Sequence, residues 1–576
     1  MKSINYIKAA CLALMGAFTA SCMELEPEAD MGDSQVWSSA DNFQLFANQF
    51  YSWTRDFTTS LVDSPHSDMR SDLMCATAIN TYSQGTNTIP TTDSNYDNAY
   101  QRIYYTNLLL DRANSYSDPD EIEVPVAEAK FFRAYLHFEL VQLYGDAILL
   151  TYPLDMDSEE LYAARNDRGE VIDQVITDLE EAAEGLPETA SEEGRLTKYA
   201  ALAMISRVAL YEGSWQKFHN NGSDATSNTT RSSELFTIAK EAAKEVMDSG
   251  KYQLFYNSTL CNHIYRYMFI LEDAAQCNPA NVYKSANTEY IFSHRHRDGD
   301  QLGVNITQAC LANSSNYFLT RKLANLYLCS DGLPIDKSPL FQGYSTATSE
   351  YQDRDNRMEN NMLRNEDNYW NNDGCWRVYW NDNDLEDCFT MTVTYGTGYH
   401  NRKWAVERQV EDYYESMDYP IIRYAEVLLN YAEAAYELDG SISDDDLDIS
   451  LNLVRLRVNP DMPKLSNTLV SSNDLDMREE IRRERTVELI VEGFRIDDLK
   501  RWATAPDEMP EDQLGIMYTG TWFESNWASV GYDTNDEGCL IIHDGRTWDD
   551  KLYLYPLPSD QLQLNPQLEQ NPGWGN

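Results

Sequence analysis

The chain has 576 residues and is strongly acidic, with 94 aspartate and glutamate residues against 45 lysine and arginine residues and a formal net charge of −49. A body this negative argues against nucleic-acid binding, because proteins hold nucleic acids largely through lysine and arginine contacts to phosphate. The length suits one large domain or two.

The amino terminus has the pattern of an export signal. Two lysines precede residues 9–20, which are uncharged and mostly apolar or small, and small residues then lead to Cys22. The apolar stretch falls short of the roughly 20 residues that span a bilayer. The pattern resembles a bacterial lipobox, so we predict a signal peptide over 1–21, acylation of Cys22 and a lipidated tether over 22–40. The alternative is an ordinary cleavage site with Cys22 as a bystander.

The first half of the mature chain is predicted to be helical, and we assign 41–255 to an N-terminal helical part. Residues 124–146 are apolar around most of the helix circumference, so this helix must be covered on several sides. Residues 167–188 form an amphipathic pattern that a glycine and a proline end. Residues 194–215 are rich in small side chains, which let helices approach closely, and 233–249 form another amphipathic helix.

The second half, 256–576, begins with a loop-rich insertion over 256–420 and ends in helices. The insertion is rich in Asn, Asp, Gly, Tyr and Trp and has few periodic segments. Irregular chain of this length usually carries function, with plain surface excursions as the alternative. Residues 421–440 carry two apolar stripes, which predict a helix sandwiched between partners. Together these patterns predict a mostly α fold, a tetratricopeptide-like scaffold of helical hairpins with long loops and a few short strands.

The arginine-rich block 478–501 carries seven basic and seven acidic side chains. Pairs such as Glu479 and Arg483 are four residues apart, a spacing that brings opposite charges together on a helix. We therefore predict a structural ion-pair lattice here and not a site for an anionic ligand.

No sequence motif of a catalytic centre is present, although among so many acidic residues a carboxylate pair of glycosidase type cannot be rejected by counting. His294 and His296 would share one face of a strand, which gives only weak support for zinc. The acidic stretches 381–388 and 443–448 are candidates for structural calcium, yet neither fits an EF-hand loop and solvated turns explain them better. We predict no catalytic residue, no metal site and no cofactor.

The strongest binding candidate is the aromatic stretch 369–384. Aromatic faces stack on the C–H faces of sugar rings, and Asn, Asp and Arg side chains bind sugar hydroxyls. If 376–380 is a strand, alternate side chains point to opposite faces, so that one face is core and the other meets ligand. The alternative is aromatic packing of an irregular domain. The candidate ligand residues in this stretch are Tyr369, Trp370, Trp376, Arg377 and Tyr379.

Two further stretches are candidates to complete such a site. The first is the long loop 66–87, and the second is 292–318, where a short basic segment interrupts an acidic sequence. The candidate ligand residues in these two stretches are Asp68, Arg70, Tyr82, His294, Arg295, His296 and Tyr317.

Several long blocks, in order behind the lipobox, resemble the SusD/RagB family of Bacteroidetes nutrient-binding outer-membrane lipoproteins. The blocks are AEAKFFRAYLHFELVQLYGD (127–146), YLCSDGLPID (327–336), PIIRYAEVLLNYAEAAYE (420–437), IRRERTVELIVEGFRIDDLKRW (481–502) and YLYPLPSDQLQLNPQLEQNPGW (553–574). In this family the glycan-contacting residues tend to come from the first long loop and from the stretch before the D-G-x-P-I turn, which correspond to 66–87 and 292–318.

The resemblance implies a mostly α-helical fold with tetratricopeptide-like hairpins. It also implies a non-catalytic lipoprotein at the outer membrane, anchored at Cys22 and facing the cell exterior. Such a protein captures an oligosaccharide or polysaccharide and delivers it to a SusC-like TonB-dependent transporter. Two alternatives are the same architecture with a peptide ligand and, with less support, a surface glycoside hydrolase.

Overall fold

The computed structural model describes residues 36–61, 63–220, 228–273, 278–297, 303–306, 317–365, 367, 377–379, 388–390, 396–408, 413–527 and 531–575. The predicted signal peptide, Cys22 and most of the tether lie outside these residues, so their assignment stays a prediction. No helix of the described residues has both the length and the apolar character needed to cross a bilayer.

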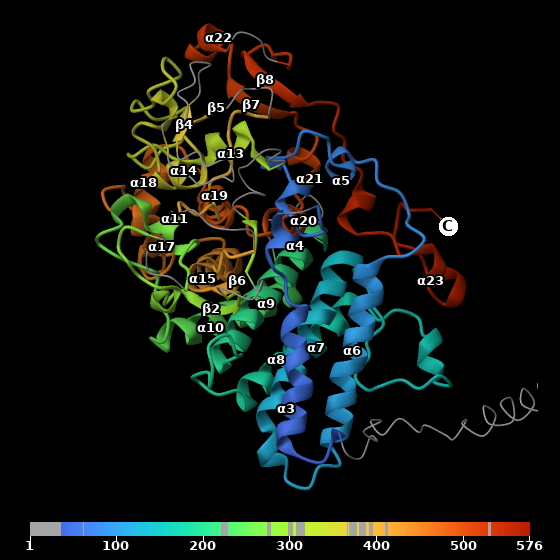
Figure 1. Ribbon diagram of the computed structural model, residues 1–576. Coiled ribbons are helices and arrows are strands. Elements are labelled where there is room, and N and C mark those ends of the chain that lie inside the picture. The colour runs from blue at the N-terminus through green and yellow to red at the C-terminus, as the bar shows by residue number, and fades with distance from the viewer. Residues whose placement is uncertain are drawn as a thin grey trace, which may run out of the picture.

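The N-terminal part is a stack of long helices (Figure 1). From α6 to α10, each long helix packs against the next one along the chain. The four helices predicted from the sequence in this part are confirmed, with ends shifted by a few residues. The long helices are α3 (Ala40–Asn48), α6 (Ser94–Ala113), α7 (Glu123–Tyr144), α8 (Arg168–Gly185), α9 (Lys198–Asn220) and α10 (Thr230–Asp248).

Helix α7 is buried around most of its circumference, as its apolar sequence predicts. It packs against α3, α6 and α8, so that no wide face is left for solvent. One of its charged side chains is buried as well: Arg133 forms an ion pair with Asp178 of α8, with Nη2 and Oδ1 separated by 2.6 Å.

The C-terminal part is built around α15 (Tyr424–Asp439), which contacts α9, α10, α17 (Leu451–Val458) and α19 (Met477–Leu489). This confirms the prediction of a helix sandwiched between partners. The predicted helix began too early, because 421–423 belong to a buried strand, β6 (Tyr419–Arg423), which pairs antiparallel with β2 (Tyr290–His294). A short apolar run fits a buried strand as well as a helix, and pairing with a distant segment decides between them.

The remaining strands are short and form two-stranded sheets. Strand β1 (Met74–Cys75) pairs with β3 (Phe318–Leu319), and β7 (Gln513–Met517) pairs with β8 (Cys539–His543). The predicted strand near 376–380 is present as β4 (Arg377–Tyr379), parallel to β5 (Cys388–Thr390). The described parts of the 256–420 insertion hold only short elements, so a mostly α fold with few short strands is confirmed.

Short helices complete the chain. They are η1 (Gln49–Trp53), α4 (Phe57–Leu61), η2 (Asp68–Arg70), α5 (Thr81–Gln84), η3 (Pro119–Ile122), η4 (Glu159–Tyr162), η5 (Cys261–His263), α11 (Ile264–Met268), η7 (Lys284–Ala286), α13 (Arg321–Leu326), η8 (Ser349–Tyr351), α14 (Asn356–Asn361), α16 (Asp444–Asp448), α18 (Asn467–Ser472), α20 (Arg495–Arg501), α21 (Ala505–Glu508), α22 (Trp522–Asn526), η10 (Asp550–Tyr553) and α23 (Ser559–Leu564).

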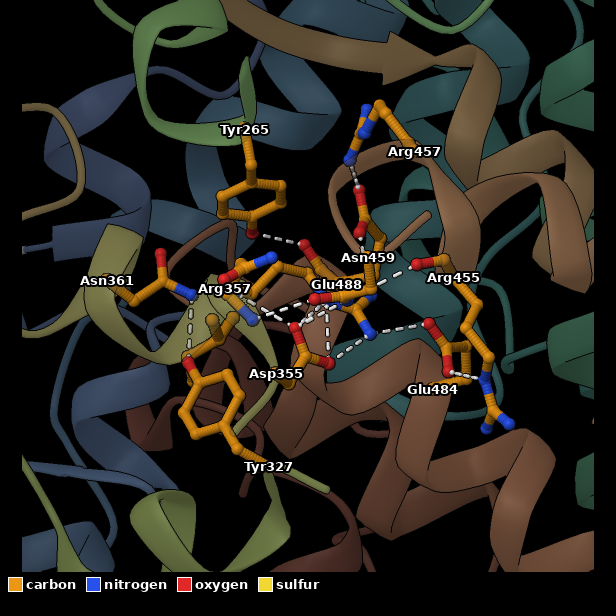
Figure 2. A network of polar contacts seen from close by, with 12 residues as sticks. Tyr265, Tyr327, Asp355, Arg357, Asn361, Arg455, Arg457, Asn459, Glu484 and Glu488 are labelled. Atoms are coloured by element: carbon orange, nitrogen blue, oxygen red, sulfur yellow. Dashed lines mark hydrogen bonds and ion pairs between the residues drawn. The ribbon is translucent and has the colours of Figure 1, made fainter. Parts of the chain in front are cut away.

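A buried lattice of ion pairs links α14, α17 and α19 (Figure 2), and Arg423 of β6 also belongs to it. The Glu488 carboxylate lies 3.0 Å from Arg357, 2.7 Å from Arg423 and 2.5 Å from Arg457. Arg423 also contacts Glu289 at 2.8 Å and Glu492 at 2.7 Å. Buried charges are tolerated only when they are paired in this way, because each charge loses its hydration.

The lattice confirms the structural interpretation of block 478–501. One predicted pair is wrong: Glu479 pairs with Arg482 at 3.5 Å, and Arg483 pairs with Glu480 at 3.2 Å, in each case three residues apart instead of four. Glu480, the partner of Arg483, is itself almost fully buried.

The C-terminal segment returns to the N-terminal part and lies beside the loop that carries α5 (Figure 1). The Tyr555 backbone N–H donates to the Leu143 carbonyl at 2.7 Å, and the Asn571 amide donates to the Tyr144 carbonyl at 3.0 Å. The Ser559 N–H donates to the Pro90 carbonyl at 3.0 Å. The last residues of the chain thus fix the end of α7 and the start of α6.

Candidate functional site

The structure buries the side chain of Asp68, one of the candidate ligand residues, completely. Its carboxylate accepts hydrogen bonds from the backbone N–H groups of Val491, at 2.7 Å, and Arg495, at 3.1 Å. Burial raises the pKa of Asp68 to about 7, although these backbone donors oppose the change. Its role is structural: it holds the turn in which Val491 adopts a positive φ of 64°.

Tyr82, a second candidate ligand residue, is also buried. Only 3% of its surface is exposed, its ring stacks on Tyr555 at a centroid distance of 5.3 Å, and its hydroxyl donates to the Leu552 carbonyl. Arg70 is partly buried beside this pair, where it donates to Asp63 at 2.5 Å and to the Tyr555 hydroxyl at 2.6 Å. The two side chains tie the first long loop to the C-terminal segment.

The basic segment after β2 divides between two faces, as expected for extended chain. The rings of His294 and His296 lie together with centroids 5.3 Å apart, and His294 Nδ1 is 2.9 Å from the Thr54 hydroxyl. Arg295 forms ion pairs with Glu193, at 2.6 Å, and with Asp418, at 3.0 Å.

This segment is less basic than the sequence suggests. Burial lowers the pKa of His294 and lowers that of His296 to about 4, so both rings are neutral at pH 7. Carboxylates already compensate the charge of Arg295. Among the described residues, no group of three or more His, Cys, Asp or Glu side chains is arranged to hold a metal ion.

The other candidates are placed only in part. Tyr317 is half-buried against the hydrophobic core. Arg377 and Tyr379 belong to β4, of which the structure describes the backbone. Tyr369, Trp370 and Trp376 lie outside the described residues. A role for these aromatic residues therefore stays a prediction.

Arg295 lines a cavity of about 310 Å³ between the start of α9 and β2, here called the Arg295 cavity. Its cations are paired with carboxylates: Lys284 lies 3.0 Å from Asp418, and Arg195 lies 3.2 Å from Glu128. The charged groups of its walls are thus already compensated, and neutral side chains such as Thr197, Asn287 and Ser293 add hydrogen-bonding groups.

A second cavity, of about 280 Å³, lies between η1, α4, α6 and α7 and is here called the Trp53 cavity. Its floor is a fixed polar chain. Arg55 lies 2.6 Å from Glu139, His66 lies 3.0 Å from the second oxygen of Glu139, and the other ring nitrogen of His66 lies 2.8 Å from Asp497. Burial opposes the charge on Glu139, but Arg55 and His66 outweigh it and hold the pKa of that carboxyl far below its usual range.

The rim of the Trp53 cavity combines an aromatic ring with hydrogen-bonding side chains. Asn95, Asn98 and Arg102 line it from one face of α6, because residues three and four apart lie side by side on a helix. The half-buried Trp53 lies opposite, with the Arg102 guanidinium carbon 5.8 Å from the centre of its ring. Thr58 adds a hydroxyl. Such a rim suits a ligand with flat apolar faces and many hydroxyl groups.

The two cavities lie on either side of the segment that carries the predicted histidines. Thr54, which bonds His294, lines the Trp53 cavity, as does His66 from the predicted loop 66–87. Trp53 and Arg102 are not among the residues predicted from the sequence. A lone tryptophan and an arginine 49 residues later carry no signal until the helices are packed together.

Comparison with known proteins decides the family. The model described as "SusD family" matches residues 283–574, slightly more than half of the chain. The chain belongs to the SusD family. A second family model, described as "Starch-binding associating with outer membrane", matches residues 27–210 of this SusD-family protein.

Individual relatives agree with this assignment. A SusD-like protein of Formosa agariphila is 33% identical over 122 residues, which is 20% of this chain and 23% of the relative. Another from the same organism is 28% identical over 134 residues, 23% of this chain and 26% of the relative. These matches therefore span about a quarter of each relative's length.

Solved structures resemble the whole fold. A SusD-like carbohydrate-binding protein from Bacteroides fragilis has a TM-score of 0.72 at 22% identity, covering 93% of this chain and all of that one. Surface glycan-binding protein A from Bacteroides fluxus has a TM-score of 0.59 at 18% identity, covering 93% of this chain and 99% of that one. At these identities the likeness establishes the fold.

Proposed function

We propose that this SusD-family protein captures oligosaccharides at the outer membrane without cleaving them and delivers them to a SusC-like TonB-dependent transporter. The observation that carries the proposal is the Trp53 cavity, which combines paired charged side chains, side-chain amides and an indole in a protein of this family. The names of the related proteins, which include carbohydrate binding and association with the outer membrane, support the same role.

In this proposal the ligand enters over the rim of the cavity. The face of Trp53 packs against a sugar ring, and the side-chain amides of Asn95 and Asn98 bind ring hydroxyls. The floor does not need to rearrange, because Glu139 already binds Arg55 and His66. A preformed site of this kind avoids part of the entropy cost of binding.

The anchor belongs to the same proposal. Acylation of Cys22 would hold the protein at the outer membrane with its body facing the cell exterior. Metabolic labelling with a fatty-acid analogue tests this: wild-type protein is expected to be labelled and Cys22→Ala is not. Co-purification of a TonB-dependent transporter with the anchored protein tests the delivery step, and its absence from membrane extracts would contradict that step.

Calorimetry against plant, host and microbial oligosaccharides, with a peptide mixture as a separate arm, tests the ligand. We expect an oligosaccharide to bind and Trp53→Ala to weaken binding by roughly 1–3 kcal/mol, the order expected for loss of an aromatic packing face. Trp53→Phe is expected to retain most of the affinity, and Trp522→Ala, in α22, is the control for loss of a remote indole.

Three outcomes would contradict the proposal. Binding of peptides in place of saccharides would reassign the ligand. Chromatography that shows catalytic release of new reducing ends would make the protein a hydrolase. If Trp53→Ala binds oligosaccharides as wild type does while its melting temperature is unchanged, the cavity is not the site.

A further inference from the structure

Arg102 differs from the other arginine of the Trp53 cavity in having no acidic partner. Within the described parts of the chain Arg102 makes no ion pair, whereas Arg55 lies 2.6 Å from Glu139 and 3.9 Å from Asp497. The Arg102 guanidinium lies instead over the ring of Trp53. Burial lowers the pKa of Arg102, and the more distant Tyr135 and Glu139 do not restore it.

The acidic groups around the cavity are already engaged. Glu139 binds both Arg55 and His66, and Asp56 accepts hydrogen bonds from the backbone N–H groups of Thr58, at 2.8 Å, and Thr59, at 3.2 Å. His66, whose pKa is raised because Asp497 and Glu139 outweigh burial and the nearby Arg55, adds positive character to the floor. Within the described residues, the cavity therefore contains one guanidinium, that of Arg102, whose charge no carboxylate pairs, in a protein whose net charge is −49.

On the basis of the proposed function, we propose that the Trp53 cavity selects oligosaccharides that carry an acidic sugar and that Arg102 binds the anionic group. The planar guanidinium matches a carboxylate or a sulfate with two parallel hydrogen bonds, which are stronger than bonds between neutral groups. Asn95 and Asn98, on the same helix face, remain for the hydroxyls of neighbouring sugars.

The net charge of the whole protein further restricts which acidic oligosaccharides can bind. A densely charged polyanion is repelled by a body with 49 excess negative charges, whereas an isolated acidic sugar within a neutral chain is repelled far less. The expected ligand is thus a mostly neutral oligosaccharide with sparse uronic-acid or sulfated residues.

The test compares matched pairs of oligosaccharides by calorimetry on the full mature chain. One arm pairs uronic-acid-containing oligosaccharides with their carboxyl-reduced forms, and the other pairs sulfated oligosaccharides with their desulfated forms. Wild-type protein is expected to prefer the acidic member of one pair, and that arm identifies the anionic group. Arg102→Gln is expected to lose about tenfold in affinity for that member and less than about twofold for its neutral form, since one charge-assisted contact is removed.

Two further variants separate a binding role from a structural one. Arg102→Lys keeps the positive charge but loses the planar guanidinium that forms two parallel hydrogen bonds. Its affinity for the acidic oligosaccharide is expected to lie between those of wild type and Arg102→Gln. Arg231→Gln removes a partly exposed arginine of α10, paired with Asp173, and changes the net charge by the same amount without touching the cavity. It is expected to bind like wild type.

Equal binding of the acidic and neutral members, with no effect of Arg102→Gln, would overturn this inference and leave oligosaccharide capture intact. If no saccharide of either kind binds to wild type, the proposed function itself fails. Equal losses in Arg102→Gln and Arg231→Gln would show a general charge effect and would also overturn the inference.

Discussion

Arg423 of the ion-pair lattice and Arg102 of the Trp53 cavity have opposite electrostatic surroundings. In the lattice, Arg423 is almost fully buried and touches three carboxylates. At the cavity rim, Arg102 is half-buried and its guanidinium lies over the ring of Trp53. The difference separates two uses of a charged side chain: a matched arginine holds segments together, whereas an unmatched one is free to meet a ligand.

The largest effect is expected from breaking the lattice at its centre. Arg423→Met would remove a cation shared by the buried carboxylates of Glu289, Glu488 and Glu492, so we expect a loss of roughly 3–5 kcal/mol in the free energy of unfolding. Urea denaturation followed by circular dichroism measures it. The matched control is Arg231→Met, and similar losses in both variants would contradict a special role for the lattice.

Acid should weaken the lattice next. Glu488 is buried, which disfavours its charge, but Arg457, Arg423 and Arg357 outweigh burial and lower its pKa to about 2, against an ordinary value of 4.5. Because its folded-state pKa is depressed, its contribution is present above pH 4.5 and is lost as pH falls through 2. The loss is roughly 3 kcal/mol for such a shift.

Denaturation at several pH values checks this loss. Glu488→Gln should flatten the fall in stability below pH 4.5, whereas Glu479→Gln, exposed on the same helix, should follow wild type. Parallel profiles for wild type and Glu488→Gln would show that another group causes acid unfolding.

Lys500 offers a further contrast with the paired arginines of the lattice, because its buried amine has no hydrogen-bond partner among the described residues. It lies over the Tyr555 ring at 4.7 Å, and burial lowers its pKa to about 8 from 10.5 despite Asp497. Between pH 8 and 10.5 the unfolded chain binds more protons, so stability should rise with pH across this window. Lys500→Met should add about 1–2 kcal/mol at pH 7 and remove that rise; a less stable variant would show that the charge is needed.

The smallest effect on stability is expected at Arg102. Arg102→Met removes a half-buried charge that no acidic group compensates, so the free energy of unfolding should change by less than about 1 kcal/mol. The same substitution at Arg423 is expected to be severe. If Arg102→Met and Arg423→Met lose similar free energies of unfolding in the same denaturation assay, the proposed difference between the two regions is wrong.

The parts of the fold that the sequence predicts well are those with long, regular patterns. Residues 124–146 are apolar around most of the helix, which predicts that α7 is covered on several sides. Block 478–501 carries equal numbers of acidic and basic side chains, which predicts the ion-pair lattice. Strand β6 is not, because its apolar residues fit a helix until β2 pairs with them.

The site is harder to predict than the scaffold. Asp68 and Tyr82 have the side chains of a binding loop, and nothing local shows that Val491 and Tyr555 will cover them. The Trp53 cavity unites Trp53, His66, Arg102 and Glu139 from segments that only packing brings together. Its chemistry is a property of the tertiary structure and not of any motif.

The return of the C-terminal segment to α6 and α7 also constrains how the protein is made. The backbone of Tyr555 bonds Leu143, more than four hundred positions earlier, so the first helices cannot reach their final arrangement while the ribosome is still adding the last residues. Folding of the N-terminal part is therefore completed only after the last residues have been made. Removal of the C-terminal segment should therefore destabilise the N-terminal helices α6 and α7 first.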